Sequence, residues 1–259
     1  MSVAHSKIII SVWCFLSFLF TPFASFASLP DIIDKIKPSV VGVGTLQKMR
    51  RPPAQLMGSG FVVADGRHII TNSHVIPEEL DVNKQEELAV FIGVGREAIV
   101  RTVELIMRDR EHDLALLKMD FRMPAMTLGD VSNVREGDSI AFTGFPIGAV
   151  LGLYPVTHRG IISVISPVVI PVDSTRTLDV NMIRRLKNPY DVFQLDATAY
   201  PGNSGSALYD AETGEVIGVI NKVFVKETKE KVLENPSGIT YAIPVKHVKK
   251  LLKSSGVKF

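Results

Sequence analysis

The chain has 259 residues, of which 46% are hydrophobic and 22% are charged, and its formal net charge is +2. This composition is that of a globular protein and excludes a disordered chain. With a charge so close to zero, and with Lys and Arg scattered along the chain, there is no electrostatic case for nucleic-acid binding. The length suits one large all-β domain or two smaller ones, with ample chain for a core.

The first 27 residues have the features of a cleaved signal peptide. An apolar stretch at 8–20 is followed by Ala24-Ser-Phe-Ala27, which offers small residues for cleavage after Ala27. A retained membrane anchor is disfavoured because Pro22 follows a stretch shorter than the roughly 20 residues needed to span. We therefore expect an exported chain with no stable membrane span, periplasmic or alternatively secreted. Cleavage also removes Cys14, the only cysteine, so no disulfide or thiol chemistry is expected.

The rest of the chain predicts many short strands and two helices. An amphipathic helix is expected at 29–36, ended by Pro38, and another at 245–253, packing on the last barrel. Between them a polar, basic segment at 175–190 interrupts the strand pattern. Strands are expected at 39–45, 58–63, 68–71, 88–92, 98–107, 114–119, 139–142, 160–165, 168–170, 192–195, 206–208, 216–224 and 239–242. Short strands separated by Gly, Pro, Asp and Asn favour an all-β barrel or sandwich over an α/β fold.

Ser204 lies in the turn Pro201-Gly-Asn-Ser-Gly205. Such a turn can expose a hydroxyl and direct successive backbone N–H groups at one point, which suits a nucleophile and an oxyanion hole. Taken alone, the string is also ordinary turn chemistry between two strands. The interpretation therefore depends on whether the chain also supplies a base and an acid.

His74 and Asp113 are the candidates for these two partners. His74 follows the apolar pair Ile69-Ile70, and Asp113 directly precedes the apolar run 114–117, so both are expected at strand ends. A serine hydroxyl needs a base with a pKa near 7, and the base needs an acid that fixes its tautomer. The chain order His74, Asp113, Ser204 is that of chymotrypsin-type triads.

Several strings of the sequence resemble the HtrA/Deg branch of the trypsin-like serine proteases. They are Gly58-Ser-Gly-Phe-Val-Val63, Thr71-Asn-Ser-His-Val75, Asp113-Leu-Ala-Leu-Leu-Lys118 and Gly202-Asn-Ser-Gly-Ser206, supported by segments 144–148, 156–163, 218–221 and 238–244. Each string is short, but the ordered set covers most of residues 29–252. The resemblance implies two six-stranded antiparallel β-barrels, at 28–132 and 133–259, with a C-terminal helix, together forming one protease domain.

The resemblance also implies roles for individual residues. Ser204 would be the nucleophile, His74 the general base and acid, and Asp113 the residue that orients His74. The oxyanion hole would be formed by the N–H groups of Gly202 and Ser204, with Asn203 between them. The primary pocket would be lined by Thr198, Ala199, Tyr200, Ile220, Asn221 and Lys222. Because no acid stands at Thr198, we expect a small or medium apolar P1 residue rather than Lys or Arg.

Three departures from the family pattern affect these expectations. Ser206 stands where the family usually has a second glycine, and it would strain the turn if that position required a positive φ. His158 and Arg159 stand where the family often has small residues. The chain ends at Phe259, about one helix after the barrel, so we expect no C-terminal PDZ domain, and the oligomeric state is left open between monomer and trimer.

The function expected is a serine endopeptidase that acts on polypeptides, including unfolded or misfolded proteins, without a cofactor. No cluster with metal-ligand spacing is visible, so no metal is expected. Two alternatives are a catalytically silent relative that binds peptides or partners in the same cleft, and an esterase with the same chemistry. His112, next to Asp113, is expected on the surface, because neighbouring strand residues face opposite ways.

Overall fold

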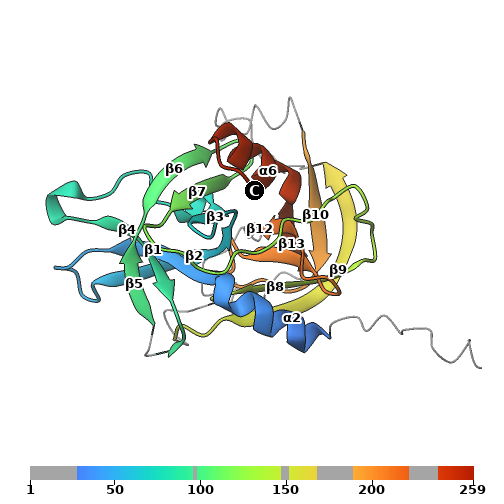
Figure 1. Cartoon of the computed structure of the whole chain (residues 1–259), viewed down its shortest axis with the longest axis horizontal. Coiled ribbons are helices and arrows are strands. Elements are labelled where there is room, and N and C mark those ends of the chain that lie inside the picture. Colours follow the sequence, from blue (N-terminus) through green and yellow to red (C-terminus); the bar gives the residue numbers. More distant parts are fainter. Residues whose placement is uncertain (1–27, 96–97, 147–151, 168–188, 222–238) are drawn as a thin grey trace, which may run out of the picture.

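The computed structural model describes residues 28–95, 98–146, 152–167, 189–221 and 239–259 (Figure 1). The expected signal peptide, the expected strand at 168–170, most of the polar segment 175–190 and the pocket residue Lys222 lie outside the described residues. Within the described ranges, no helix is both long and apolar enough to cross a membrane.

Seven strands form an antiparallel sheet in the N-terminal half, in the order β5-β4-β1-β2-β3-β7-β6. Their bounds are β1 (Val40–Leu46), β2 (Ala54–Val63), β3 (His68–Asn72), β4 (Glu87–Ile92), β5 (Ile99–Thr102), β6 (Glu104–Asp109) and β7 (Leu114–Lys118). The expected hairpin at 58–71 is present as β2 and β3, with Gly66 in its turn at a φ of +81°.

The sequence predicts six strands here, and the seventh arises because one of them bends. The single strand expected at 98–107 is divided at Val103 into β5, which pairs with β4, and β6, which pairs with β7. β5 and β6 are the two edges of the sheet and adjoin at one residue, so the bend brings the edges together and curls the sheet. The side chain of Val103 packs into the interior of the curl.

The C-terminal half is a closed six-stranded barrel in the order β10-β13-β12-β11-β8-β9. Its strands are β8 (Ser139–Gly144), β9 (Val156–Pro167), β10 (Asp191–Asp196), β11 (Ala207–Asp210), β12 (Val216–Ile220) and β13 (Ile239–Pro244). The all-β architecture with a closed six-stranded barrel agrees with the prediction from sequence.

Three hydrophobic cores explain the continuous apolar runs of the sequence. Along β2, Val62 packs inside the N-terminal sheet, whereas Phe61 and Val63 pack between the two sheets. Along β11, Leu208 packs inside the C-terminal barrel, whereas its neighbours pack between the sheets. Since side chains alternate between the faces of a strand, a strand buried on both faces is apolar throughout.

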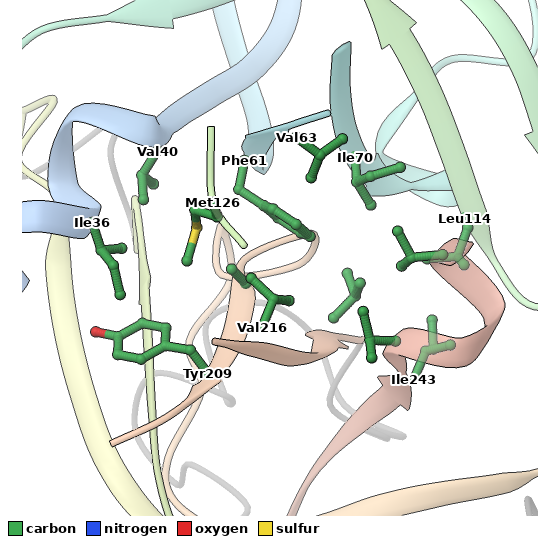
Figure 2. Packing of buried hydrophobic residues seen from close by; sticks show 14 of the residues in the cluster. Ile36, Val40, Phe61, Val63, Ile70, Leu114, Met126, Tyr209, Val216 and Ile243 are labelled. Carbon is green, nitrogen blue, oxygen red and sulfur yellow. The ribbon is translucent and has the colours of Figure 1, made fainter. Parts of the chain in front are cut away.

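The core between the sheets holds the two halves against each other. Figure 2 shows Phe61, Ile70 and Leu114 from the N-terminal sheet pointing toward Val216 and Ile243 of the barrel. All five of these side chains are fully buried. Because the strands that carry the candidate site residues belong to this shared core, the relative position of the two halves is fixed by close packing.

Two helices complete this core, and both agree with the prediction from sequence. α2 (Leu29–Ile36) buries Ile32 and Ile36, and its first turn is closed by Ser28, which donates two hydrogen bonds to Asp31 Oδ2. α6 (Val245–Ser254) buries Val248, Leu251 and Leu252 and contacts β12, β13 and also β7 (Figure 1). The C-terminal helix thus packs on the last barrel, as expected, and also ties it to the N-terminal sheet.

Candidate active site

His74 and Asp113 meet at the end of the N-terminal sheet. His74 lies in a short 3-10 turn (Ser73–Val75) directly after β3, and Asp113 directly precedes β7, the strand beside it. Asp113 Oδ2 is 2.6 Å from His74 Nδ1, and Asp113 Oδ1 accepts the backbone N–H of His74 at 2.9 Å. The Asp113 side chain is 14% exposed and that of His74 is 32% exposed. A shielded carboxylate therefore holds a ring that is accessible from solvent.

The backbone of Asp113 is in the left-handed region, with a φ of +53°. This conformation is uncommon for a residue other than glycine, although Asp and Asn tolerate it best. The carbonyl of Asp113 accepts hydrogen bonds from the backbone N–H of Ser73 at 3.1 Å and from Asn72 Nδ2 at 3.0 Å. These two contacts stabilise the unusual conformation and keep Asp113 in register with His74.

The turn that carries Ser204 packs against the same end of the N-terminal sheet. The carbonyl of Ser204 accepts the backbone N–H of Ser59, in β2, at 2.8 Å. A Cβ on Gly205 would come within 2.1 Å of Ser59 O, 2.5 Å of Thr71 Oγ1 and 3.2 Å of Asn72 N. The serine turn thus packs against Thr71 and Asn72, which precede His74 in the chain by three and two residues. Within the described part of the chain, the hydroxyl of Ser204 makes no hydrogen bond, and catalytic hydrogen bonds are often long in the absence of substrate.

Backbone geometry in this turn sets which N–H groups are free. Asn203 N–H donates to Tyr200 O at 3.0 Å, and Gly205 N–H donates to Ile220 O at 2.9 Å. The N–H groups of Gly202 and Ser204 have no partner among the described residues. Gly202 has a φ of +103° and Gly205 one of +87°, so both positions favour glycine. Of the three residues considered from sequence, Gly202 and Ser204 carry the available donors and Asn203 connects them.

Ser206, two residues after Ser204, does not strain the turn. Among the described residues, the non-glycine positions with positive φ are Ala64, Gln85 and Asp113, and Ser206 is not one of them. The positive φ belongs to Gly205 instead. The substitution of the family's second glycine therefore changes the side chain in this place without a backbone penalty.

Ser59 is a site residue that the sequence reasoning missed. Its hydroxyl donates to Gly202 O at 2.6 Å and accepts the N–H of Phe145 at 2.9 Å, while its carbonyl accepts Thr71 Oγ1 at 2.7 Å. Ser59 is fully buried, and its backbone N–H, its carbonyl and its hydroxyl all make hydrogen bonds. It thereby connects β2 to the serine turn and to the end of β8. The available signal was a serine between two glycines, Gly58 and Gly60, in a strand.

Replacing Ser59 with alanine is expected to lower the free energy of unfolding by about 2–4 kcal/mol, because the buried N–H of Phe145 and the half-buried carbonyl of Gly202 lose their partner. Urea denaturation followed by circular dichroism measures this change. Ser163→Ala, at an exposed position of β9, is the control and should stay within about 0.5 kcal/mol of the wild type. Equal denaturation midpoints for Ser59→Ala and the wild type would show that the Ser59 hydroxyl does not hold the turn.

The described residues proposed from sequence to line the primary pocket come from the segment 198–200 before the serine turn and from the end of β12. Ala199 is buried and donates its N–H to Thr240 Oγ1 at 3.1 Å, while Thr198 and Tyr200 beside it are half-buried. Ile220 is buried at the end of β12, and Asn221 N–H donates to Tyr241 O at 2.9 Å. The segment 198–200 and the end of β12 are linked to the turn through Tyr200 O and Ile220 O.

His112 is buried, and the expectation that it lies on the surface is wrong. It belongs to a turn at 110–113 and not to a strand, so the alternation of strand side chains does not apply. Its Nδ1 lies 2.7 Å from Asp109 Oδ2, and its ring stacks on that of His247 at 4.0 Å and contacts Tyr190 at 4.8 Å. Despite burial, the hydrogen bonds from the side chain and backbone of His112 hold the pKa of Asp109 below its ordinary value.

His247, on α6, faces this cluster from the other side. Burial lowers the pKa of His247 to about 3, and the charges of His112 and Lys246 contribute further. The ordinary pKa of the imidazole is 6.5, so between these two values the unfolded chain binds a proton that the folded chain does not. The free energy of unfolding should therefore fall as the pH is lowered from about 7 toward 3, with this residue contributing up to about 4 kcal/mol.

The His247→Phe variant tests this pH dependence, because phenylalanine keeps the ring stack and removes the proton. Urea unfolding at intervals between pH 7 and pH 4 should show a shallower loss of stability in the variant than in the wild type. His68→Gln removes a histidine outside the cluster and serves as the control. Parallel curves for His247→Phe and the wild type would contradict the prediction.

No group of three or more His, Cys, Asp or Glu side chains in the described ranges is arranged to hold a metal ion. An acid–base pair, His74 and Asp113, and a turn with a serine hydroxyl and two free N–H groups face the same end of the N-terminal sheet.

A family model described as a trypsin-like peptidase domain matches residues 58–219. A probable periplasmic serine endoprotease, DegP-like, from Halomonas elongata is 32% identical over 194 residues, which are 73% of this chain and 33% of that protein. Serine protease HTRA1A from Danio rerio is 28% identical over 236 residues, covering 88% of this chain and 41% of that protein. The HtrA-type protease AlgW with decapeptide superimposes with a TM-score of 0.64 and 26% identity, over 88% of this chain and 67% of that one.

The two barrel-like halves and the arrangement at their junction are those of a chymotrypsin-type fold. The chain belongs to the family of trypsin-like peptidases, and its similarity is to the HtrA/Deg branch of that family. It spans about a third to two fifths of the length of these two curated relatives.

Proposed function

We propose that this protein is an exported serine endopeptidase that hydrolyses peptide bonds through an acyl-enzyme. The observation that carries the proposal is the pairing of His74 with Asp113 at 2.6 Å beside the turn of Ser204. Ser204 is the nucleophile, His74 the general base and then the general acid, and Asp113 the residue that orients His74. Polypeptide substrates are supported by the peptide-bound structure of the related protease AlgW.

The hydrogen bond between His74 and Asp113 determines which ring nitrogen of His74 takes the proton of Ser204. Asp113 Oδ2 accepts the proton on His74 Nδ1, which leaves Nε2 without a proton and able to accept the one from Ser204 as its oxygen attacks the scissile carbonyl. The protonated His74 then donates to the leaving amine. The N–H groups of Gly202 and Ser204 stabilise the oxyanion that forms in between, because they are free and belong to one turn.

Export rests on the amino-terminal sequence and on the relatives. We infer that residues 1–27 are a signal peptide cleaved after Ala27, and that the mature chain acts in a periplasm or outside the cell. The DegP-like relative from Halomonas elongata is named as periplasmic, which supports this location. Mass spectrometry of the protein recovered from the periplasmic fraction should give Ser28 as its first residue.

A fluorophosphonate probe that reacts with activated serines tests the proposed activity. The purified full chain should be labelled, with the adduct on the peptide that contains Ser204, and labelling should inhibit hydrolysis of unfolded casein. Absence of labelling under all conditions would favour a peptide-binding relative without activity. Labelling with hydrolysis of small esters but not of casein would favour an esterase.

The primary specificity is expected to be for a small or medium apolar P1 residue. Thr198 and Ala199 are uncharged, and the described part of the proposed pocket contains no acid that would pair with Lys or Arg. Cleavage of a random peptide library followed by mass spectrometry measures the preference. A dominant Lys or Arg at P1 would overturn this part of the proposal.

A further inference from the structure

His158, on β9, contacts the serine turn through Asn203 but has no role in the proposed acyl-transfer steps. Asn203, between the two proposed oxyanion donors, is fully buried. Its side-chain Nδ2 lies 3.4 Å from Nε2 of His158, which is on β9. Asn203 also fixes the turn through its backbone, since its N–H donates to Tyr200 O and its carbonyl accepts the N–H of Ser206.

The ring of His158 packs against two aromatic side chains. Its ring stacks on that of Phe142, directly opposite on β8, at 4.9 Å and an interplanar angle of 22°. The ring of Tyr200, which belongs to the segment leading into the serine turn, lies 5.9 Å away at a tilt. Half-buried between these rings, the imidazole has little freedom and offers its Nε2 to Asn203.

Two buried polar atoms beside this contact have no hydrogen-bond partner among the described residues. They are Asn203 Oδ1 and Ser206 Oγ, both inaccessible to solvent. Both border Gly144, because a Cβ built there would lie 3.1 Å from Asn203 Oδ1 and 2.0 Å from Ser206 Oγ. Unpartnered buried groups of this kind are energetically costly.

We propose that His158 is a positioning residue for the oxyanion turn, and that it acts by holding the side-chain amide of Asn203. This inference rests on the proposed function, because it assigns His158 to the same site. The peptide bond between Asn203 and Ser204 carries the Ser204 N–H, so the orientation of Asn203 sets the direction of that donor. His158 fixes this orientation through its contact with Asn203 Nδ2, while Ser59 fixes the carbonyl of Gly202 through a hydrogen bond from its hydroxyl.

The protonation state of His158 selects the orientation of the amide. Neutral His158 accepts a hydrogen bond from Asn203 Nδ2–H at Nε2, and burial lowers the pKa of His158, so this form prevails at neutral pH. Protonated His158 carries a proton on Nε2 and faces a second donor. The amide then has to rotate so that Oδ1, in place of Nδ2, faces His158 and accepts the proton of Nε2.

Other titratable groups near His158 do not account for such a response. On the elements packed around it, Arg159 follows it on β9, Asp196 lies opposite Ile161 on β10, and the phenols are those of Tyr200 and Tyr209. Among the described residues none of these groups forms an ion pair or hydrogen bond with the imidazole. Arg159 and Asp196 are exposed, so their charges are screened by solvent.

Two substitutions at one position separate positioning from mere packing. His158→Phe keeps the stack on Phe142 and removes the acceptor, and it should lower kcat on a peptide substrate by about 10- to 100-fold with KM changed less than about threefold. His158→Gln restores an acceptor that does not titrate, and its kcat at pH 8 should return to within about threefold of the wild type. Its activity should also fall less steeply than that of the wild type between pH 7 and pH 5. Equal kcat values for His158→Phe and the wild type, or equal impairment of both variants, would overturn the inference.

A second measurement does not depend on activity and so distinguishes this inference from the proposed function. In the Ser204→Ala full chain, which avoids autolysis, the NMR signal of the Asn203 side-chain amide should shift with the titration of His158. The same signal should be constant with pH in the Ser204→Ala, His158→Gln double variant. A signal that is insensitive to pH in both chains would refute the contact. A pH-dependent signal in the Ser204→Ala chain, together with no fluorophosphonate labelling of the wild-type full chain, would refute only the proposed function.

Discussion

Replacing Ser204 with alanine is expected to lower kcat for peptide hydrolysis by about four to six orders of magnitude. The variant loses the acyl-enzyme route but keeps the backbone donors of the turn, so a small residual rate from the oxyanion site and substrate binding should persist. The hydrogen bonds that seat the turn use the Ser204 carbonyl and the Ser59 N–H, not the Ser204 hydroxyl. The variant should therefore fold and bind substrate with a KM close to that of the wild type.

Burst and steady-state kinetics on a fluorogenic peptide measure this loss, with the protein purified to the point where a co-purified protease cannot supply the residual rate. Ser132→Ala, at an exposed loop position, is the matched control and should keep full activity. A Ser204→Ala chain that retains more than a tenth of the wild-type rate would remove Ser204 from the nucleophile role.

Much of the fold could be predicted because burial on both faces makes strands conspicuous. The runs at 61–63, 114–117 and 216–220 are apolar throughout, since alternate residues pack into two different cores. The bend at Val103 was not predictable in the same way. Both faces of the chain from 99 to 109 are largely exposed, so no break in hydrophobicity marks the point where β5 passes into β6.

The candidate triad could be identified from sequence because its members need particular chemistry at strand ends. Residues that only position it gave weaker signals. Ser59 acts through its burial against a turn 143 residues later in the chain, which no local pattern reveals. His112 was misplaced because Asp113 adopts a positive φ, and a strand rule cannot be extended into a left-handed turn. The contact of His158 with Asn203 likewise depends on the register of β8 and β9.

Asparagine at position 113 is expected to lower kcat by about 10⁴-fold while leaving the backbone intact. Asparagine tolerates the φ of +53° that Asp113 adopts, so the turn should be preserved. Asp113 uses one oxygen for the His74 N–H and the other for His74 Nδ1. The amide has only one oxygen. If that oxygen keeps the backbone N–H, the NH₂ group faces Nδ1, the ring proton moves to Nε2, and His74 can no longer accept the proton of Ser204.

The neighbouring pair offers an unusually close control for this variant. Asp109 accepts the His112 N–H at 3.0 Å with one oxygen and lies 2.7 Å from His112 Nδ1 with the other, which repeats the geometry of Asp113 and His74. Asp109→Asn should therefore cost about 1–3 kcal/mol of stability, as a buried hydrogen bond to a charged group does, yet leave kcat within about tenfold of the wild type. The nitrogen-15 NMR shifts of His74 should report the change of tautomer in Asp113→Asn alone. If both variants lost activity equally, the effect would be structural, and Asp113 would have no special role in orienting His74.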